Sequence, residues 1–202
     1  MNPSNQAPLD YLNQIAPTEA RKSPFKLGPK LFIIIGIVLV LIVIVLSVAV
    51  NNINNSRREP WQTLSARLDT TEKIATASTD TIKNSQLRSL NSDVKIYLTN
   101  TKRDLQTPLT AQSIKATELP ATITTQEANT DMTARLETGR LNAKFDSTYA
   151  REMSYQLATV LTLLQKLYAS SGSDANKTFL KTAYDNLAPT QKAIAEFSAS
   201  NE

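Results

Sequence analysis

The hydrophobic and polar positions of this chain divide it into one unbroken apolar run and a long series of helix-spaced stripes. Residues 31–50 read LFIIIGIVLVLIVIVLSVAV and carry no charge. A helix of this length is about 30 Å long, which matches the hydrocarbon core of a bilayer. The run also lacks the polar stripe that a buried helix of a soluble protein shows. We therefore predict a transmembrane helix over residues 31–50.

Beyond this run, apolar residues recur every three or four positions, which is the spacing of amphipathic helices. Pro60 suits the first turn of a new helix, so we expect the first stripe to start separately from the apolar run. A Thr-rich segment with Pro120 and the turn SSGSD separate later stripes. The predicted helices span Trp61 to Ile82, Leu87 to Leu105, Ala128 to Gly139, Phe145 to Tyr168 and Phe179 to Phe197.

Long helices joined by short connections predict an all-α fold, in which the transmembrane helix is followed by an antiparallel up-and-down bundle of four to five helices. A parallel homo-oligomeric stalk from Trp61 onward is the alternative, but the polar residues Thr71 and Ser78 on its stripe count against it. The predicted regions are a disordered cytoplasmic tail (1–30), the transmembrane helix (31–50), a polar linker (51–59) and an extracytoplasmic helical bundle (60–200).

The charges beside the apolar run predict its orientation. Basic flanks stay in the cytoplasm, and Arg57 and Arg58 on the far side weaken this signal without reversing it. The run is longer than the core of a cleaved signal peptide, so an uncleaved signal-anchor in the cell membrane is favoured over cleavage near Ser47-Val48-Ala49. The orienting residues before the run are Arg21, Lys22, Lys26 and Lys30.

One short segment of the proline-rich tail has helical apolar spacing. It offers a docking motif for a cytoplasmic protein partner, and the alternative is a solvated tail with a few apolar residues. The motif consists of Leu9, Tyr11, Leu12 and Ile15.

The composition removes most catalytic chemistry. The chain has no histidine and no cysteine, which excludes Ser-His-Asp and Cys-His catalysis and thiolate metal sites. No Gly-rich phosphate loop is present, no lysine lies on an apolar stripe to serve a Ser–Lys pair, and Glu152 and the other acids mostly fall off the stripes. The net charge of +4 is partly due to the tail, so the bundle is not expected to bind nucleic acid. We predict no enzyme activity and no cofactor.

Three segments carry a resemblance to a known family. They are PLDYLNQIAP (8–17), KLGPKLFIII (26–35) and LRSLNSDVKIYLTNT (87–101). With these segments the chain resembles uncharacterised single-span, signal-anchored membrane proteins of ultrasmall, host-attached bacteria of the Saccharibacteria type. The resemblance implies a membrane-anchored helical protein that faces the cell surface, and it implies no activity.

These observations predict a structural or protein-interaction role in the cell envelope, with a protein partner outside and an oligomeric state that the sequence leaves open. The alternative is a small-ligand-binding or sensor bundle that acts through a cytoplasmic partner docked on the tail. A hydrolase that uses Ser–Lys or carboxylate chemistry is the third, least favoured hypothesis.

Overall fold

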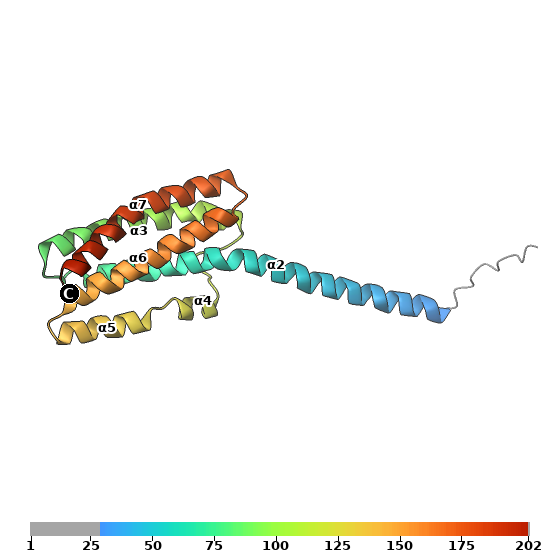
Figure 1. Cartoon of the computed structure of the whole chain (residues 1–202). Coiled ribbons are helices and arrows are strands. Elements are labelled where there is room, and N and C mark those ends of the chain that lie inside the picture. Colours follow the sequence, from blue (N-terminus) through green and yellow to red (C-terminus); the bar gives the residue numbers. More distant parts are fainter. Residues whose placement is uncertain (1–28, 202) are drawn as a thin grey trace, which may run out of the picture. The chain divides into compact units, whose positions relative to one another are not determined.

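The computed structural model describes the backbone of residues 29–201 and the side chains of residues 40, 42, 43 and 57–201. Every regular element in this part of the chain is a helix, which confirms the predicted helical bundle. The helices are α2 (Pro29–Ser78), α3 (Ser85–Ala111), α4 (Ala121–Gln126), α5 (Thr130–Leu141), α6 (Phe145–Ser170) and α7 (Asp174–Ser200) (Figure 1).

The chain forms two units, Met1–Ala49 and Val50–Glu202, and the boundary falls at the end of the apolar run. Within the part of the chain that the structure describes, no helix has the length and hydropathy needed to cross a membrane. The side chains of residues 31–39, 41 and 44–50 lie outside that part, so the transmembrane helix stays a prediction.

The polar segment 51–59 is helical, and the prediction that Pro60 begins a separate helix is wrong. α2 continues through both, with Pro60 inside it. Proline removes one backbone hydrogen bond of a helix and crowds the preceding turn. Packing just beyond it offsets this cost, because Trp61 and Leu64 are 4% and 0% exposed. Trp61 is therefore a core residue, as its place on the stripe predicts.

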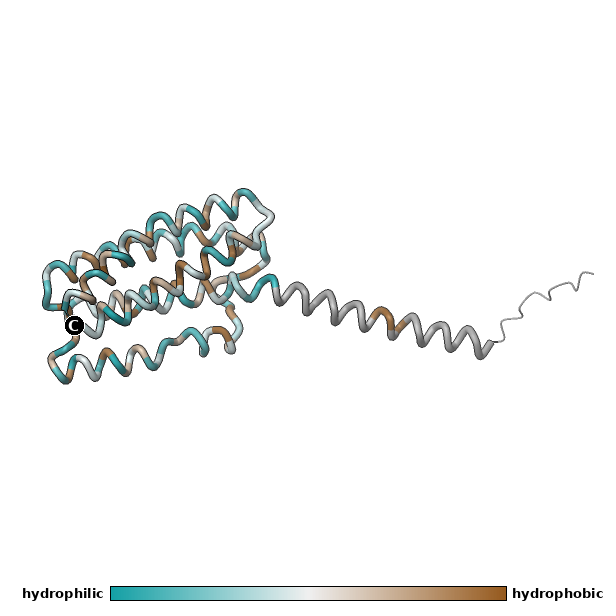
Figure 2. The backbone as a smooth tube through the Cα atoms, viewed as in Figure 1, coloured by the Kyte–Doolittle hydropathy of each residue, from teal (hydrophilic) through white to brown (hydrophobic). Residues whose placement is uncertain are grey.

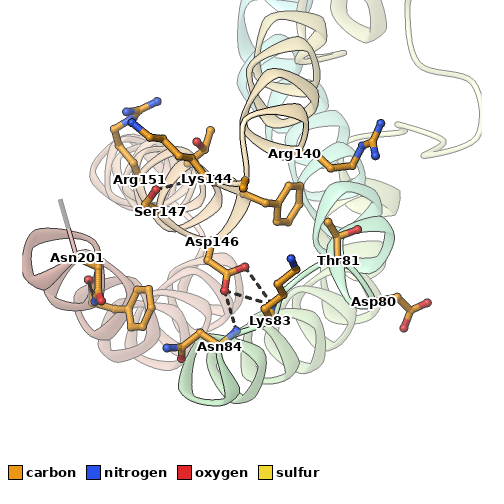
Figure 3. A pocket seen from close by; sticks show the side chains of 14 residues that line it. Asp80, Thr81, Lys83, Asn84, Arg140, Lys144, Asp146, Ser147, Arg151 and Asn201 are labelled. Carbon is orange, nitrogen blue, oxygen red and sulfur yellow. Dashed lines mark hydrogen bonds between the residues drawn. The ribbon is translucent and has the colours of Figure 1, made fainter.

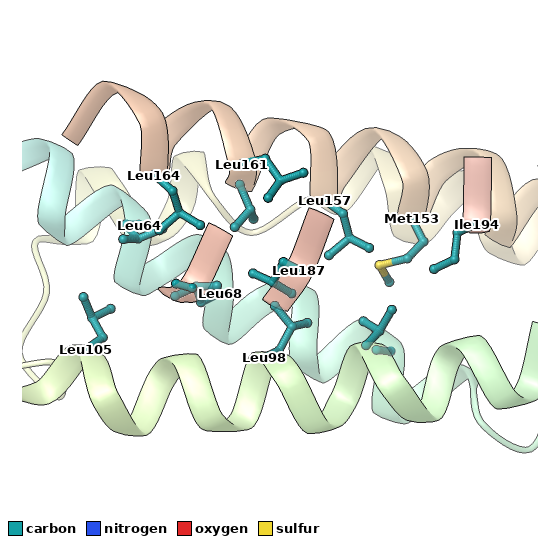
Figure 4. Close-up of a cluster of buried hydrophobic side chains, with 14 of the residues drawn as sticks. Leu64, Leu68, Leu98, Leu105, Met153, Leu157, Leu161, Leu164, Leu187 and Ile194 are labelled. Atoms are coloured by element: carbon teal, nitrogen blue, oxygen red, sulfur yellow. The ribbon is translucent and has the colours of Figure 1, made fainter. Parts of the chain in front are cut away.

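The core of the second unit lies among α2, α3, α6 and α7, and the predicted stripes supply it (Figure 4). Apolar residues alternate with polar ones along these helices at the turn spacing (Figure 2). Complete burial of a leucine stabilises a fold by about 1.5–3 kcal/mol. Fully buried leucines from the four helices include Leu64, Leu98, Leu157 and Leu187.

In the second unit α2 and α3 run in opposite directions, as do α6 and α7, whereas α3 and α6 both start at the same end because α5 returns the chain between them (Figure 1). Two helices start with a side-chain cap: Asn84 accepts a hydrogen bond from the backbone of Leu87 in α3, and Ser173 accepts one from Asn176 in α7. Pro108 does not end its helix, because α3 continues to Ala111, and Pro189 lies inside α7.

One polar contact that the stripes do not predict crosses the core. The Tyr149 hydroxyl donates to Asn91 Oδ1, and Asn91 Nδ2 donates to the backbone oxygen of Ala75 at 3.1 Å. Both side chains are fully buried, and burial raises the pKa of the Tyr149 hydroxyl. Because each buried polar atom has a partner, the contact links α2, α3 and α6 without leaving an unsatisfied group.

The segment from Ala121 to Leu141, called here the α4–α5 arm, is attached differently. Its buried apolar residues are few, namely Ile123, Met132 and Leu136. Buried polar side chains supply the remaining attachment. Arg67 of α2 binds Glu127 through two hydrogen bonds of 2.6 and 2.9 Å, and Glu127 is 4% exposed.

Candidate functional site

A basic cup lies at one end of the bundle, where the α2–α3 connection, the α5–α6 corner and the end of α7 meet (Figure 3). Its cavity has a volume of about 970 Å³. The cup follows the end of α2 at Ser78, and Arg58 lies about twenty residues before that end. Because a helix rises about 1.5 Å per residue, the cup is about 30 Å from Arg58 at the other end of the bundle.

Asp146 joins two walls of the cup. It lies in the first turn of α6, and its carboxylate accepts hydrogen bonds from the backbone nitrogens of Lys83, at 3.1 and 3.2 Å, and of Asn84, at 2.7 Å (Figure 3). The carboxylate therefore fixes the α2–α3 connection against the start of α6. Its hydrogen-bonding capacity is used for structure, although its negative charge stays in the cup.

The α5–α6 corner is built by close packing rather than by a glycine turn. The sequence places Gly139 near the end of a helix, but Gly139 is buried inside α5, and a Cβ atom there would lie 2.6 Å from Thr148 Oγ1. The left-handed turn falls instead on Ala143, whose φ is 55°. The absence of a side chain at Gly139 thus allows α5 to approach the first turns of α6.

Two arginines on the rim of the cup are paired with carboxylates outside it. Arg140 binds Glu137 at 2.6 Å within α5, and Arg151 donates to Glu152 at 3.2 Å. Arg135 also donates to Glu152, at 2.8 Å, and so links the α4–α5 arm to α6. Burial of Glu152 raises its pKa, but the hydrogen bonds from the two arginines outweigh burial and lower the pKa overall.

Lys83 and Lys144 complete the cationic lining of the cup. Both are exposed, and within the described residues neither amino group pairs with a carboxylate. Lys144 immediately precedes α6, whose first turn has no side-chain cap. Four cationic and two acidic side chains therefore line the cup, since Asp80 is the second acid beside Asp146.

A second hollow, of about 640 Å³, lies between α2, α3 and the α4–α5 arm. Lys102 on its wall binds Asp69 at 2.6 Å and also binds Glu72. Burial lowers the pKa of Lys102, but the two carboxylates outweigh burial and raise it. A lysine that acts as a general base needs a lowered pKa, so Lys102 does not suit that chemistry.

Two polar side chains are buried away from the predicted stripes. Glu152 is 7% exposed, although its spacing places it off the core. Asn176, part of an Asn-x-Thr sequence, is also buried, and its backbone takes part in the Ser173 cap. Among the described residues, no three acidic side chains gather as a metal site would require.

The side chains predicted from the sequence to orient or dock the chain lie outside the described residues. Lys30 lies in the first turn of α2, but its side chain is outside the described residues. The other predicted site residues lie wholly outside them, namely Leu9, Tyr11, Leu12, Ile15, Arg21, Lys22 and Lys26.

The cup residues had no signal in the sequence, because they lie on connections and helix ends that only the folded chain brings together. No known protein helps to assign them: no family model matches the chain, and neither does any curated protein or solved structure.

Proposed function

We propose that this chain is a single-span protein of the cell membrane that holds its helical bundle outside the cell for a structural or protein-interaction role in the envelope. The tail of residues 1–30 faces the cytoplasm in this proposal, with Arg21, Lys22, Lys26 and Lys30 holding the orientation. The resemblance to single-span proteins of Saccharibacteria-type bacteria implies the same arrangement.

The position of the unit boundary supports this proposal most strongly. The second unit begins at Val50, where the apolar run ends, and it closes its core with residues from Trp61 onward. The run is therefore not needed to fill that core. Val40 and Ile42, in the middle of the run, are 59% and 48% exposed. Side chains at i and i+2 point to different sides of a helix, so exposed aliphatic groups there call for an apolar surrounding, which a lipid bilayer supplies along a whole run of this length.

Membrane extraction tests the anchor. We expect the full chain to stay in the membrane fraction through an alkaline wash. The double variant Val40→Asp, Ile42→Asp places two charges near the middle of the run, each costing about 2.5–3.5 kcal/mol for insertion, and should be released. The matched variant Val40→Leu, Ile42→Leu should stay. A wild-type chain that washes off would contradict the proposal.

Photo-cross-linking in intact cells tests the interaction role. A photoreactive residue at Lys144, on the cup, should join the bundle to an envelope protein, whereas the same residue at Lys192, on an exposed face of α7, should not. Equal capture at both positions, or none at either, would count against a specific partner.

The cup favours a second function, a ligand-binding or sensor bundle. Its volume of about 970 Å³ lies within the usual range of small-molecule sites, about 300–1,000 Å³. A sensor of this design would signal through a cytoplasmic protein docked on the tail. A photoreactive residue at Tyr11 should then capture a partner, and loss of that capture in a Leu9→Ser, Leu12→Ser variant would support the docking motif. No capture at Tyr11 would contradict the sensor function.

A further inference from the structure

We infer that the basic cup binds a small anion with two or more phosphate or carboxylate groups, held between Lys83 and Lys144. The inference rests on the second proposed function, because it specifies what that site would bind. It does not depend on the membrane anchor.

The charges of the lining favour an anion. The lining has four cationic and two acidic side chains: Arg140 and Arg151 have carboxylate partners outside the cup, and the charges of Asp80 and Asp146 remain within it. The two lysines have no such partners in the described part of the chain. Amino groups without a carboxylate partner bind phosphate and carboxylate oxygens through charge-assisted hydrogen bonds.

The placement of the two lysines favours more than one anionic group. Lys83 comes from the α2–α3 connection, and Lys144 comes from the α5–α6 corner, so the cationic groups belong to different walls (Figure 3). A single small ion would satisfy one wall, whereas a ligand with two or more groups reaches both. The cavity of about 970 Å³ has room for such a ligand.

The local backbone adds to this preference. The first turn of α6 begins beside Lys144 without a side-chain cap, and the amides at the start of a helix attract negative charge. Asp146 in that turn faces the α2–α3 connection, so its carboxylate does not cap its own helix (Figure 3). Lys144 and these amides therefore favour an anion at the same wall.

Isothermal titration of the full chain in detergent micelles at low salt tests the inference. Inorganic pyrophosphate and tricarballylate serve as the phosphate and carboxylate probes, and orthophosphate serves as the single-group control. We expect at least one of the first two to bind at least about tenfold more tightly than orthophosphate, because it engages two charged partners. The probe that binds more tightly identifies the chemistry of the ligand.

A matched pair of variants shows where the probe binds. Lys83→Gln, Lys144→Gln should weaken binding by at least about tenfold. Lys166→Gln, Lys192→Gln removes the same charge from exposed faces of α6 and α7 and should change binding by less than about twofold. Failure of both multivalent probes to bind would overturn the inference, as would equal weakening in the two variants. Neither result would alter the membrane-extraction test, so failure here is distinguishable from failure of the anchor.

Discussion

The core of four helices and the α4–α5 arm belong to the same unit but are held by different forces. α6 places ten residues in the interior, most of them apolar, whereas α5 places three, and one of these is Gly139. The arm compensates with buried ion pairs and amide contacts, such as the 3.0 Å hydrogen bond from Gln156 to Asn129. Apolar burial thus stabilises the core, and specific polar partners position the arm that shapes one wall of the cup.

Shortening a core side chain should give the largest effect. Leu157 is fully buried in α6, so Leu157→Ala should lower the free energy of unfolding by about 2–5 kcal/mol through lost burial and a new cavity. Ile96 on α3 is 56% exposed, and Ile96→Ala should change stability by less than about 0.5 kcal/mol. Chemical denaturation followed by circular dichroism measures both, and similar effects would contradict the assigned core.

Breaking the ion pair between Arg67 and Glu127 should detach the arm without unfolding the core. Arg67→Met leaves the Glu127 carboxylate buried without its partner, which should destabilise the packed arm by about 3 kcal/mol. The loss cannot exceed the free energy that holds the arm against the core, because the arm then detaches. Hydrogen exchange should quicken in residues 121–141 and stay slow in α6. The control Arg103→Met removes only an exposed pair with Asp104 and should leave exchange unchanged. Uniform quickening throughout the bundle would contradict a separately held arm.

Adding one methyl group should show how closely the arm approaches α6. A Cβ at position 139 would lie 2.6 Å from Thr148 Oγ1, so Gly139→Ala should destabilise the arm by about 2 kcal/mol. Gly172, in the α6–α7 turn, has no atom within 4 Å of the corresponding position, and Gly172→Ala serves as the control. Hydrogen exchange of residues 121–141 measures the effect of both variants. Unchanged exchange in the Gly139→Ala variant would show that α5 and α6 are not closely packed at Thr148.

Acid should destabilise the protein by protonating the carboxylates of its ion pairs. Burial raises the pKa values of Asp69, Glu72 and Glu152, but hydrogen bonds to their cationic partners outweigh burial and lower them. Their contribution to stability is therefore full above the unfolded pKa values of about 4 and is lost as pH falls through the folded values. The free energy of unfolding, measured as a function of pH, should fall below about pH 4. Glu152→Gln should reduce the slope of this fall. A slope that the variant leaves unchanged would contradict the role of Glu152.

The same contrast explains what the sequence could predict. Leu64, Leu98 and Leu157 recur at helical spacing, so the helices and most of their buried faces follow from local periodicity. Helix α2 does not stop at Pro60, because the packing of Trp61 overrides a local signal. The pairs Arg67–Glu127 and Arg135–Glu152 join residues far apart in the chain, and no spacing identifies such partners.

The cup could not be predicted from the sequence either, because its residues are far apart in the chain and meet only in the folded protein. Lys83 and Lys144 are unremarkable surface residues until the α2–α3 connection and the α5–α6 corner meet, and Asp146 fixes that meeting through backbone donors. The apolar run is the opposite case, since its length and flanking charges are read directly from the sequence.

Cysteine labelling tests the proposed display of the bundle most directly, because the chain has no native cysteine. Ser200→Cys places a thiol on the exposed end of α7, and Ser4→Cys places one in the tail. A membrane-impermeant maleimide should label the Ser200→Cys variant in intact cells and the Ser4→Cys variant only after lysis. The reverse pattern, or labelling of both variants only after lysis, would contradict an anchored bundle outside the cell.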